Sequence, residues 1–397
     1  MTVRRVVIVG AGVAGVTAVE ALRDAGFSGH ITVLDADGRP PYDRPPLSKS
    51  ALAEGVPVDL RPQSVWDRLD VDLQLGVTAL GVDVAGHTVS TSVGTLGYDR
   101  LLLATGGIAR WPRALRQLAG TAVLRTADDA LALRGRLVEG ARLVVVGAGL
   151  VGCEVAATAR RLGVHVTLVD PVQLPLAGVV GEEIATALLD RHSAEGVDVR
   201  TGQGAVGLVG EHSVEAVELD DGTRLPADAV LVAVGGAAAS AWLVGSGLAL
   251  AEPAPDGGVR CTRALQAGPD VFVAGDLAVP DGVGRSEHWM AAVEQAEVAA
   301  ANLLSTAGEQ REWVPAPYFW TDQYDVKVQV VGVPPAEPPA LRDASADGRR
   351  QLQVWADGEG RAVAAATVNW PARAMAWRER VRLAEPIDGF VTAKATA

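Results

Sequence analysis

The sequence predicts an α/β fold in which one strand–turn–helix–strand repeat occurs twice. The chain has 397 residues, of which 49% are hydrophobic and 21% charged, enough apolar material for two or three domains with buried cores. An apolar run, a glycine-rich turn and a helical segment follow one another in residues 3–35 and again in residues 141–170. This succession is typical of a parallel sheet with crossover helices.

The first repeat starts with an apolar strand, residues 6–9, and enters a G-A-G-V-A-G turn at residues 10–15. A helix follows as far as Leu22, and the next strand, residues 31–34, ends in Asp35. In this G-x-G-x-x-G pattern the first glycine makes a tight turn, the second lets the backbone approach a pyrophosphate, and the third lets helix and strand pack closely. The helix N-terminus offers amides to the phosphate, and the acid binds a ribose. The pattern therefore predicts a Rossmann-like dinucleotide-binding domain.

The second repeat has the same order. A strand at residues 143–146 enters a G-A-G-L-V-G turn at residues 147–152, a helix extends to Leu162, and a strand at residues 166–169 ends in Asp170. Two such repeats predict two dinucleotides, and hydride transfer between a flavin and a nicotinamide is the natural use of the pair.

Asp170 also indicates which nicotinamide cofactor is used. An Asp at this strand end bonds the 2′-hydroxyl of NADH and repels the 2′-phosphate of NADPH. Residues 171–176, which follow it, contain no Arg or Lys to receive that phosphate. NADH is therefore expected.

Three other segments carry weaker signals. Two apolar strands, within residues 101–107 and 271–276, end in a glycine. Residues at the carboxyl end of a strand in a parallel sheet can contact a ligand bound in the crevice there. Residues 229–251 carry no charge and are long enough to span a membrane, but Gly235, Gly236 and later glycines interrupt them. We expect a buried strand, a loop and a short helix there.

Composition excludes several classes of function. The net charge of −13 argues against nucleic acid as a partner. Cys153 and Cys261, the two cysteines, are too few for a disulfide scaffold. No signal peptide precedes the first strand, so the cytoplasm is the expected compartment. Neither a membrane anchor nor a metal site is predicted.

Five strings together resemble a known family, the FAD-dependent, NADH-linked ferredoxin reductases of the glutathione-reductase fold that serve bacterial Rieske oxygenases and haem-thiolate monooxygenases. The resemblance covers essentially the whole chain. The strings at residues 41–49 and 317–324 are specific to this family, and the others are shared more widely among flavoproteins. The strings are residues 41–49, 124–130, 273–276, 287–289 and 317–324.

The resemblance implies three domains. Residues 1–112 and 240–313 would form an FAD-binding domain, and residues 113–239 an NAD-binding domain inserted into it. Residues 314–397 would form a C-terminal α+β interface domain. That last segment holds ten basic and ten acidic residues, so the net charge of the chain belongs to residues 1–313.

The resemblance also implies three catalytic residues. Lys49 is one of only three lysines, against 32 arginines, which suggests that a compact point charge is wanted there. The family places it near the flavin N5, with Glu154 beside the nicotinamide as its ion-pair partner and Trp320 at the flavin edge on the electron exit path. The alternative is a surface lysine and a glutamate favoured by a helix N-terminus.

The remaining predicted site residues bind the cofactors. Those for FAD are Gly10, Gly12, Gly15, Asp35, Arg44, Lys49, Ala79, Thr105, Gly106, Arg125, Gly275, Asp276 and Trp289. Those for NADH are Gly147, Gly149, Leu150, Val151, Gly152, Asp170 and Gly235.

The electron acceptor follows from what the chain lacks. Relatives that reduce disulfides or peroxides place a thiolate against the flavin, but residues 42–53, where it would lie, contain no cysteine. Electrons would pass directly to a 2Fe-2S ferredoxin. Because ferredoxins are generally acidic, the four arginines and one glutamate of residues 373–382 could steer docking; the alternative is a solvated helix face.

Two other functions stay open from the sequence alone. One is an NADH-linked flavoenzyme with a quinone or oxygen as acceptor, and the other is a flavoprotein of the apoptosis-inducing-factor kind. The chain would act as a monomer or homodimer.

Overall fold

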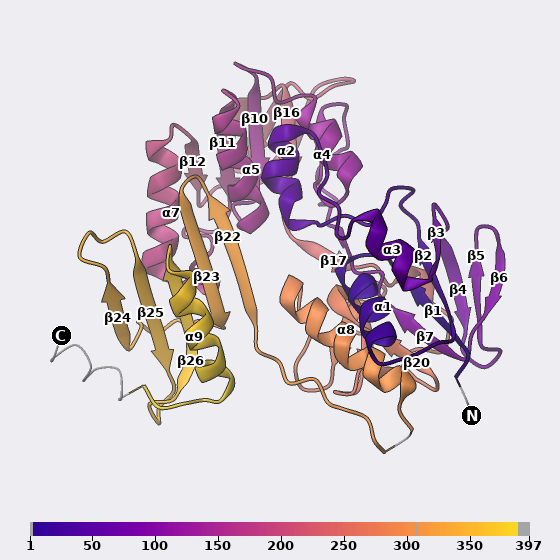
Figure 1. Cartoon of the computed structure of the whole chain (residues 1–397). Coiled ribbons are helices and arrows are strands. Elements are labelled where there is room, and N and C mark those ends of the chain that lie inside the picture. Colours follow the sequence, from indigo (N-terminus) through magenta and orange to yellow (C-terminus); the bar gives the residue numbers. More distant parts are fainter. Residues whose placement is uncertain (1–2, 307, 388–397) are drawn as a thin grey trace. The chain divides into compact units, whose positions relative to one another are not determined.

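The computed structural model describes residues 3–306 and 308–387 (Figure 1). They form two compact units. The first unit comprises the described parts of Met1–Asp43, Val58–Ile108 and Gly236–Pro315, and the second those of Arg44–Pro57, Ala109–Gly235 and Ala316–Ala397. Residues 44–57, expected in the FAD-binding domain, pack in the second unit, and the predicted domain boundaries stay a prediction.

The first unit is built on a six-stranded sheet of order β19-β20-β7-β1-β2-β3, parallel except for β19. Residues 6–9 are all buried, as expected of a strand in the middle of a parallel sheet. Helix α1 packs against helix α8. The bounds are β1 (Arg5–Val9), α1 (Val13–Asp24), β2 (His30–Asp35), β3 (Asp72–Leu75), β7 (Arg100–Leu103), β19 (Gln266–Gly268), β20 (Val271–Val273) and α8 (Trp289–Leu304).

Smaller elements complete the first unit. An antiparallel sheet joins β4, β5 and β6, and two-stranded pairs join β17 to β8 and β18 to β21. Their bounds, with those of the short helices, are α3 (Gln63–Leu69), β4 (Ala79–Asp83), β5 (Thr88–Thr91), β6 (Gly94–Gly97), β8 (Gly107–Ala109), β17 (Gly236–Ala238), η2 (Ala241–Leu243), β18 (Val259–Cys261), η3 (Gly275–Leu277) and β21 (Ala278–Pro280).

The second unit repeats the parallel design in a five-stranded sheet of order β12-β11-β10-β16-β9. Its elements are η1 (Pro45–Ser48), α2 (Ser50–Glu54), β9 (Thr121–Ala122), α4 (Ala127–Arg134), β10 (Arg142–Val146), α5 (Leu150–Arg161), β11 (His165–Asp170), α6 (Ala177–Val180), α7 (Glu182–Ala194), β12 (Asp198–Thr201) and β16 (Ala229–Val232). A separate antiparallel sheet holds β13 (Ala205–Val209), β14 (Ala216–Leu219) and β15 (Arg224–Pro226).

The uncharged segment from residue 229 to 251 contains β16, β17 and the short helix η2, which confirms the predicted strand, loop and helix. Within the described ranges, no helix is long and apolar enough to cross a membrane.

A third sheet, antiparallel and of order β22-β23-β26-β25-β24, ends the second unit, and helix α9 packs on it, as expected of an α+β domain. Leu352, Val354 and Trp377 form the core on the α9 side. On the other face Trp355 packs against Gly181, where a Cβ would lie 2.7 Å from the indole Cζ2. The bounds are β22 (Tyr318–Gln323), β23 (Val326–Gly332), β24 (Leu341–Ala344), β25 (Gln351–Ala356), β26 (Ala362–Val368) and α9 (Pro371–Arg382).

Candidate functional site

The first glycine turn joins β1 to α1. Gly10 has φ of +107°, and a Cβ there would lie 2.3 Å from the carbonyl oxygen of Ala104. A Cβ on Gly15 would lie 1.9 Å from the carbonyl oxygen of Gly10, so both positions require glycine. Asp35, at the end of β2, accepts a hydrogen bond from the amide of Ala11 (2.6 Å). The close glycine contacts and the hydrogen bond from Ala11 to Asp35 therefore hold the turn in one conformation.

The second glycine turn, between β10 and α5, has the same geometry. Gly147 also has φ of +107°, and a Cβ on Gly152 would lie 1.9 Å from the carbonyl oxygen of Gly147. Asp170 accepts hydrogen bonds from the amides of Ala148 and Val172, both at 2.8 Å. A Cβ on Gly149, by contrast, would meet no protein atom within 4 Å. This glycine leaves space for a ligand, as the pyrophosphate reading requires.

Both helices that follow these turns have open N-termini. Gly12 caps α1 and Gly149 caps α5, and neither helix receives a side-chain hydrogen bond at its cap. The first-turn amides are therefore available to an anion. Leu150 and Val151 are the first two residues of α5, so their predicted contact with NADH would be made at this helix end.

Four other predicted residues of the first unit lie at the same sheet edge. Thr105 and Gly106 follow β7, and Gly275 and Asp276 follow β20, both in the same parallel sheet as β1. The Thr105 hydroxyl donates to the carbonyl of Ala239 (3.0 Å). Carboxyl ends of parallel strands meet at one edge, so these turns lie together with the first glycine turn.

Two further residues of the first unit lie elsewhere. The Trp289 indole, at the start of α8, donates to Asp43 Oδ1 (2.9 Å). Ala79 begins β4, in the separate antiparallel sheet; the nearby amide of Val77 donates to the carbonyl of Asp35 (2.9 Å). Their contacts with FAD stay a prediction.

Three further residues assigned to cofactors lie in the second unit, outside its glycine turn. Arg44 precedes η1, and the amide of Arg125, just before α4, donates to Asp129 Oδ2 (3.0 Å). Gly235 has φ of +96°, and its carbonyl accepts from the amide of Arg110 (3.0 Å). The structure thus places Arg44 and Arg125 in the other unit from the first glycine turn.

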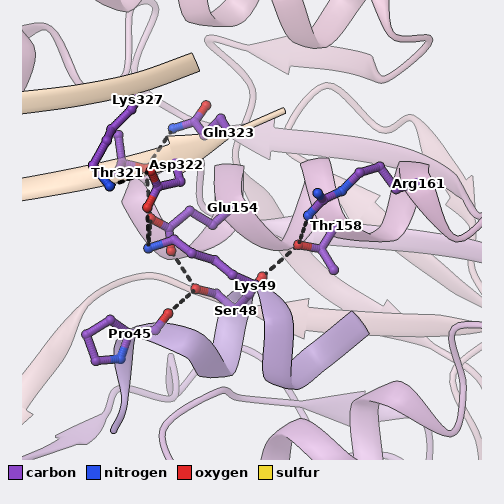
Figure 2. Close-up of polar contacts among 10 residues, drawn as sticks. All are labelled: Pro45, Ser48, Lys49, Glu154, Thr158, Arg161, Thr321, Asp322, Gln323 and Lys327. Carbon is purple, nitrogen blue, oxygen red and sulfur yellow. Dashed lines mark hydrogen bonds and ion pairs between the residues drawn. The ribbon is translucent and has the colours of Figure 1, made fainter. Parts of the chain in front are cut away.

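A buried charge cluster forms where η1, α5 and β22 meet (Figure 2). Lys49 Nζ lies 3.0 Å from Glu154 Oε1 and 3.5 Å from Asp322 Oδ2. Ser48 Oγ donates to Glu154 Oε2 (2.5 Å), and Thr321 Oγ1 donates to Glu154 Oε1 (2.8 Å). Glu154 is only 6% exposed, so its charge depends on these three partners. The predicted Lys49–Glu154 pair is present, and the surface alternative does not hold for Glu154.

Sequence reasoning missed the rest of this cluster. Asp322 also pairs with Lys327 Nζ (3.0 Å), so both lysines in the described ranges bind one carboxylate. The scarcity of lysine in the sequence is the signal that points to Lys327 as well as to Lys49. Thr158 in α5 donates to the carbonyl of Ser48 (2.8 Å) and so holds the end of η1 against α5. Lys394 lies outside the described residues.

Trp320 lies in β22 next to this cluster in sequence. Side chains alternate along a strand, so it points to the opposite face from Thr321. Its ring is half-buried and lies 6.1 Å from the ring of Tyr318, centroid to centroid. A role on the electron path stays a prediction.

Neither thiol is suited to redox chemistry. Cys153 and Cys261 are both buried and unpaired with each other. Burial raises the pKa of Cys153 and raises that of Cys261 to about 12, so both stay protonated and unreactive. In the described ranges, no group of three or more His, Cys, Asp or Glu side chains could hold a metal ion.

Three arginines of α9 make side-chain contacts with aromatic rings or with a glutamate. Arg378 is half-buried, with its guanidinium 5.6 Å from the centroid of the Tyr318 ring. Arg380 lies over Trp377, and Arg382 pairs with Glu379. Of these three arginines only Arg382 is exposed. Arg378 is therefore a packing residue, and Arg382 is a surface charge.

Comparison with known proteins extends these observations. The model of the family described as pyridine nucleotide-disulphide oxidoreductase matches residues 4–296, and one described as reductase C-terminal matches residues 318–393. The biphenyl dioxygenase system ferredoxin–NAD(+) reductase component of Paraburkholderia xenovorans (strain LB400) is 38% identical over 342 residues, 82% of this chain and 80% of that protein.

Two solved structures are similar over nearly the whole chain. The ferredoxin reductase for the CYP199A2 system from Rhodopseudomonas palustris has a TM-score of 0.89 at 31% identity, covering 96% of this chain and 95% of that one. A chain in the covalent putidaredoxin reductase–putidaredoxin complex has a TM-score of 0.88 at 31% identity, covering 97% and 94%.

Proposed function

Because this chain belongs to the pyridine nucleotide-disulphide oxidoreductase family, we propose that it is an NADH-dependent FAD flavoprotein that reduces a 2Fe-2S ferredoxin. The similar proteins are named as ferredoxin reductases, and one was solved joined to its putidaredoxin. One observation carries the proposal furthest. The ammonium of Lys49, a largely covered side chain, is held by the buried Glu154 on the helix that starts at the second glycine turn.

The residues of the two glycine turns fit two dinucleotides. In each turn two glycines are required by close backbone contacts, and the helix that follows has no side-chain cap. We assign the first turn, with Asp35, to FAD and the second, with Asp170, to NADH. The carboxylates of Asp35 and Asp170 already accept amides of their own turns, which orients them for the ribose hydroxyls.

An FAD held at the first glycine turn would supply an acceptor for the hydride of NADH and a donor of single electrons to an iron–sulfur cluster. The protein's part is to hold charges where the reaction needs them. Lys49 is fixed between two carboxylates, Glu154 and Asp322, and the Ser48 hydroxyl fixes the free oxygen of Glu154. A preorganised ammonium of this kind stabilises negative charge that develops at the reacting centre. We assign Lys49 and Glu154 to that centre and Trp320 to the exit path.

The acidic ferredoxin would dock at α9, where Arg382 is exposed. Long-range attraction between opposite charges raises the rate of encounter. We further propose that the enzyme works in the cytoplasm, where NADH is available and where thiols such as Cys153 and Cys261 stay reduced.

The test is a comparison of electron acceptors. The FAD-loaded chain is reduced by NADH without oxygen and then mixed with an acidic 2Fe-2S ferredoxin, a quinone or oxygen in a stopped-flow instrument. We expect ferredoxin to reoxidise the flavin fastest. Faster reoxidation by the quinone or oxygen would replace the proposal with a small-acceptor enzyme, and a stable reduced complex with every acceptor would favour a signalling flavoprotein.

A further inference from the structure

A buried line of hydrogen bonds leads away from Glu154 Oε1, the oxygen that Lys49 also contacts. Thr321 Oγ1 donates to Glu154 Oε1 (2.8 Å), and Gln323 Nε2 donates to Thr321 Oγ1 (3.2 Å), as Figure 2 shows. Beyond them, His192 Nε2 lies 3.0 Å from Gln323 Oε1. Thr321, Gln323 and His192 are each at most 1% exposed. No water competes for these bonds, so their donors and acceptors must match.

The line is possible because β22 and α7 pack in the same unit. Thr321 and Gln323 are alternate residues of β22 and therefore share one face of the sheet. His192 comes from the last turn of α7. Its other ring nitrogen, Nδ1, lies 3.0 Å from the hydroxyl of Tyr324, which follows β22.

The orientation of the Gln323 amide sets the direction of every bond. Gln323 turns its carbonyl oxygen toward His192, so His192 must carry a proton on Nε2. The amide group of Gln323 then donates to Thr321, and the single hydroxyl hydrogen of Thr321 is left for Glu154. A flipped Gln323 amide would instead accept from Thr321 and remove a donor from the buried carboxylate. His192 prevents this flip.

Two conditions hold His192 in that form. Burial lowers the pKa of His192, against the opposing effect of its bond to Gln323, so the ring is neutral and one nitrogen is free to accept. Burial also raises the pKa of Tyr324, so its hydroxyl stays protonated and can donate to Nδ1 when the ring proton is on Nε2.

Tyr324 has a left-handed backbone conformation, which is unfavourable for a tyrosine. Its φ is +57°, a region that favours glycine or asparagine. Its ring meets the His192 ring edge-on at 5.2 Å between centroids, and the guanidinium of Arg191 lies 5.6 Å from its centroid. These two ring contacts stabilise tyrosine at a turn position that by itself would favour glycine or asparagine.

We propose that His192 is a positioning residue for the reduction of flavin by NADH. Its Nε2–H holds the Gln323 amide, and through Gln323 and Thr321 it fixes the Glu154 carboxylate that pairs with Lys49. His192 acts through two intervening side chains. The inference rests on the proposed function, which places Glu154 and Lys49 at the reacting centre.

Two matched substitutions separate this role from packing. The amide nitrogen of Gln stands as many bonds from Cβ as His Nε2, so His192→Gln keeps a donor for Gln323. The amide of Asn corresponds to Nδ1, so His192→Asn loses that donor. Both replacements are neutral and polar, so the pair differs chiefly in reach.

Each FAD-loaded variant is reduced by NADH without oxygen, and the limiting rate and the apparent Kd for NADH are both measured. Loss of one neutral hydrogen bond should slow the limiting rate about three- to tenfold in His192→Asn. In His192→Gln the rate should stay within about twofold of the wild type, and Kd within about twofold in both variants. Equal rates in all three proteins would overturn the proposal, and so would equal slowing in both variants, which indicates packing.

NMR of the labelled histidine nitrogens in the wild-type holoprotein reads the tautomer without turnover. The His192 signals are assigned by their loss in His192→Gln, and we expect a neutral ring with the proton on Nε2. A proton on Nδ1, or a charged ring at neutral pH, would overturn the proposal. A chain that fails to reduce ferredoxin would refute the proposed function, while the tautomer would still decide this inference.

Discussion

Replacing Lys49 by Met tests the buried charge cluster, because Met keeps an unbranched side chain and removes the ammonium. The side chains of Lys49 and Glu154 are 17% and 7% exposed, and the two charges are 3.0 Å apart. Removing one partner of a buried ion pair costs about 3–5 kcal/mol, since the other charge is left uncompensated. Glu154 keeps its hydrogen bonds from Ser48 and Thr321, so we expect the lower end, about 3 kcal/mol.

The loss of stability is measured by thermal unfolding of the holoprotein. A cost of about 3 kcal/mol corresponds to a fall in Tm of about 6–12 °C for units of this size. The matched control is the double variant Lys49→Met with Glu154→Gln, in which a neutral amide replaces the stranded carboxylate. It should recover about half of the lost stability or more, because neighbouring substitutions are not additive.

The same variant tests the role of Lys49 in the reaction. Removing one preorganised charge beside the reacting centre should slow flavin reduction by NADH about tenfold or more, with FAD retained. Normal reduction kinetics at full FAD occupancy would remove Lys49 from that centre. An unchanged Tm would show that the pair contributes nothing to folding.

Three further predictions follow from the described contacts. Asp170→Ala should lower kcat/KM for NADH by the equivalent of about 1.5–3 kcal/mol and narrow the gap to NADPH; an unchanged ratio of the two efficiencies would contradict the ribose assignment. Arg382→Glu, which leaves the packing residue Arg378 intact, should slow association with an acidic ferredoxin at low salt, and the defect should fade near about 0.15 M, where the screening length is about 8 Å. If the association rate changes with neither the substitution nor the salt concentration, the ferredoxin docks elsewhere. Because burial lowers the pKa of His192 below its ordinary 6.5, the unfolded chain binds more protons than the folded one in that range, and stability should fall as pH drops through about 6.5. His192→Gln should lose less Tm than the wild type between about pH 7.5 and about pH 5.5, and equal losses would rule out this cause.

The two glycine turns could be predicted from sequence because their G-x-G-x-x-G spacing is local. Gly15, for example, contacts the backbone of Gly10 in the same turn, whereas the contact of Gly10 with Ala104, just after β7, depends on the sheet. The strands and helices around them are found within a residue or two of the predicted ends, since apolar periodicity defines both.

The full Lys49 cluster could not be predicted in the same way. Asp322 and Thr321 come from β22, far along the chain, and reach Lys49 and Glu154 only because β22 packs on α5. No local pattern encodes that packing. The same limit applies to His192, whose proposed role depends on the contact that α7 makes with Gln323 of β22.

The placement of Arg44 shows a further limit. Expected in the FAD-binding domain, it lies instead in the unit that contains the second glycine turn, whereas Arg125 lies in that unit as expected. Residues 44–57 join that unit through contacts of η1 and α2 with α4 and α5. Sequence order alone assigns residues 44–57 to the first unit, because the segments before and after them both belong to it.

The central claim is that the chain carries electrons from NADH through FAD to a 2Fe-2S ferredoxin, and a single-turnover measurement tests it most directly. The FAD-loaded chain is reduced with one equivalent of NADH without oxygen and mixed with excess oxidised ferredoxin, and the flavin and cluster absorbances are followed together. The account predicts that two ferredoxins are reduced for each flavin reoxidised, because a hydride carries two electrons and the cluster accepts one. A flavin that NADH leaves oxidised, or a reduced flavin that leaves the ferredoxin oxidised, would contradict it.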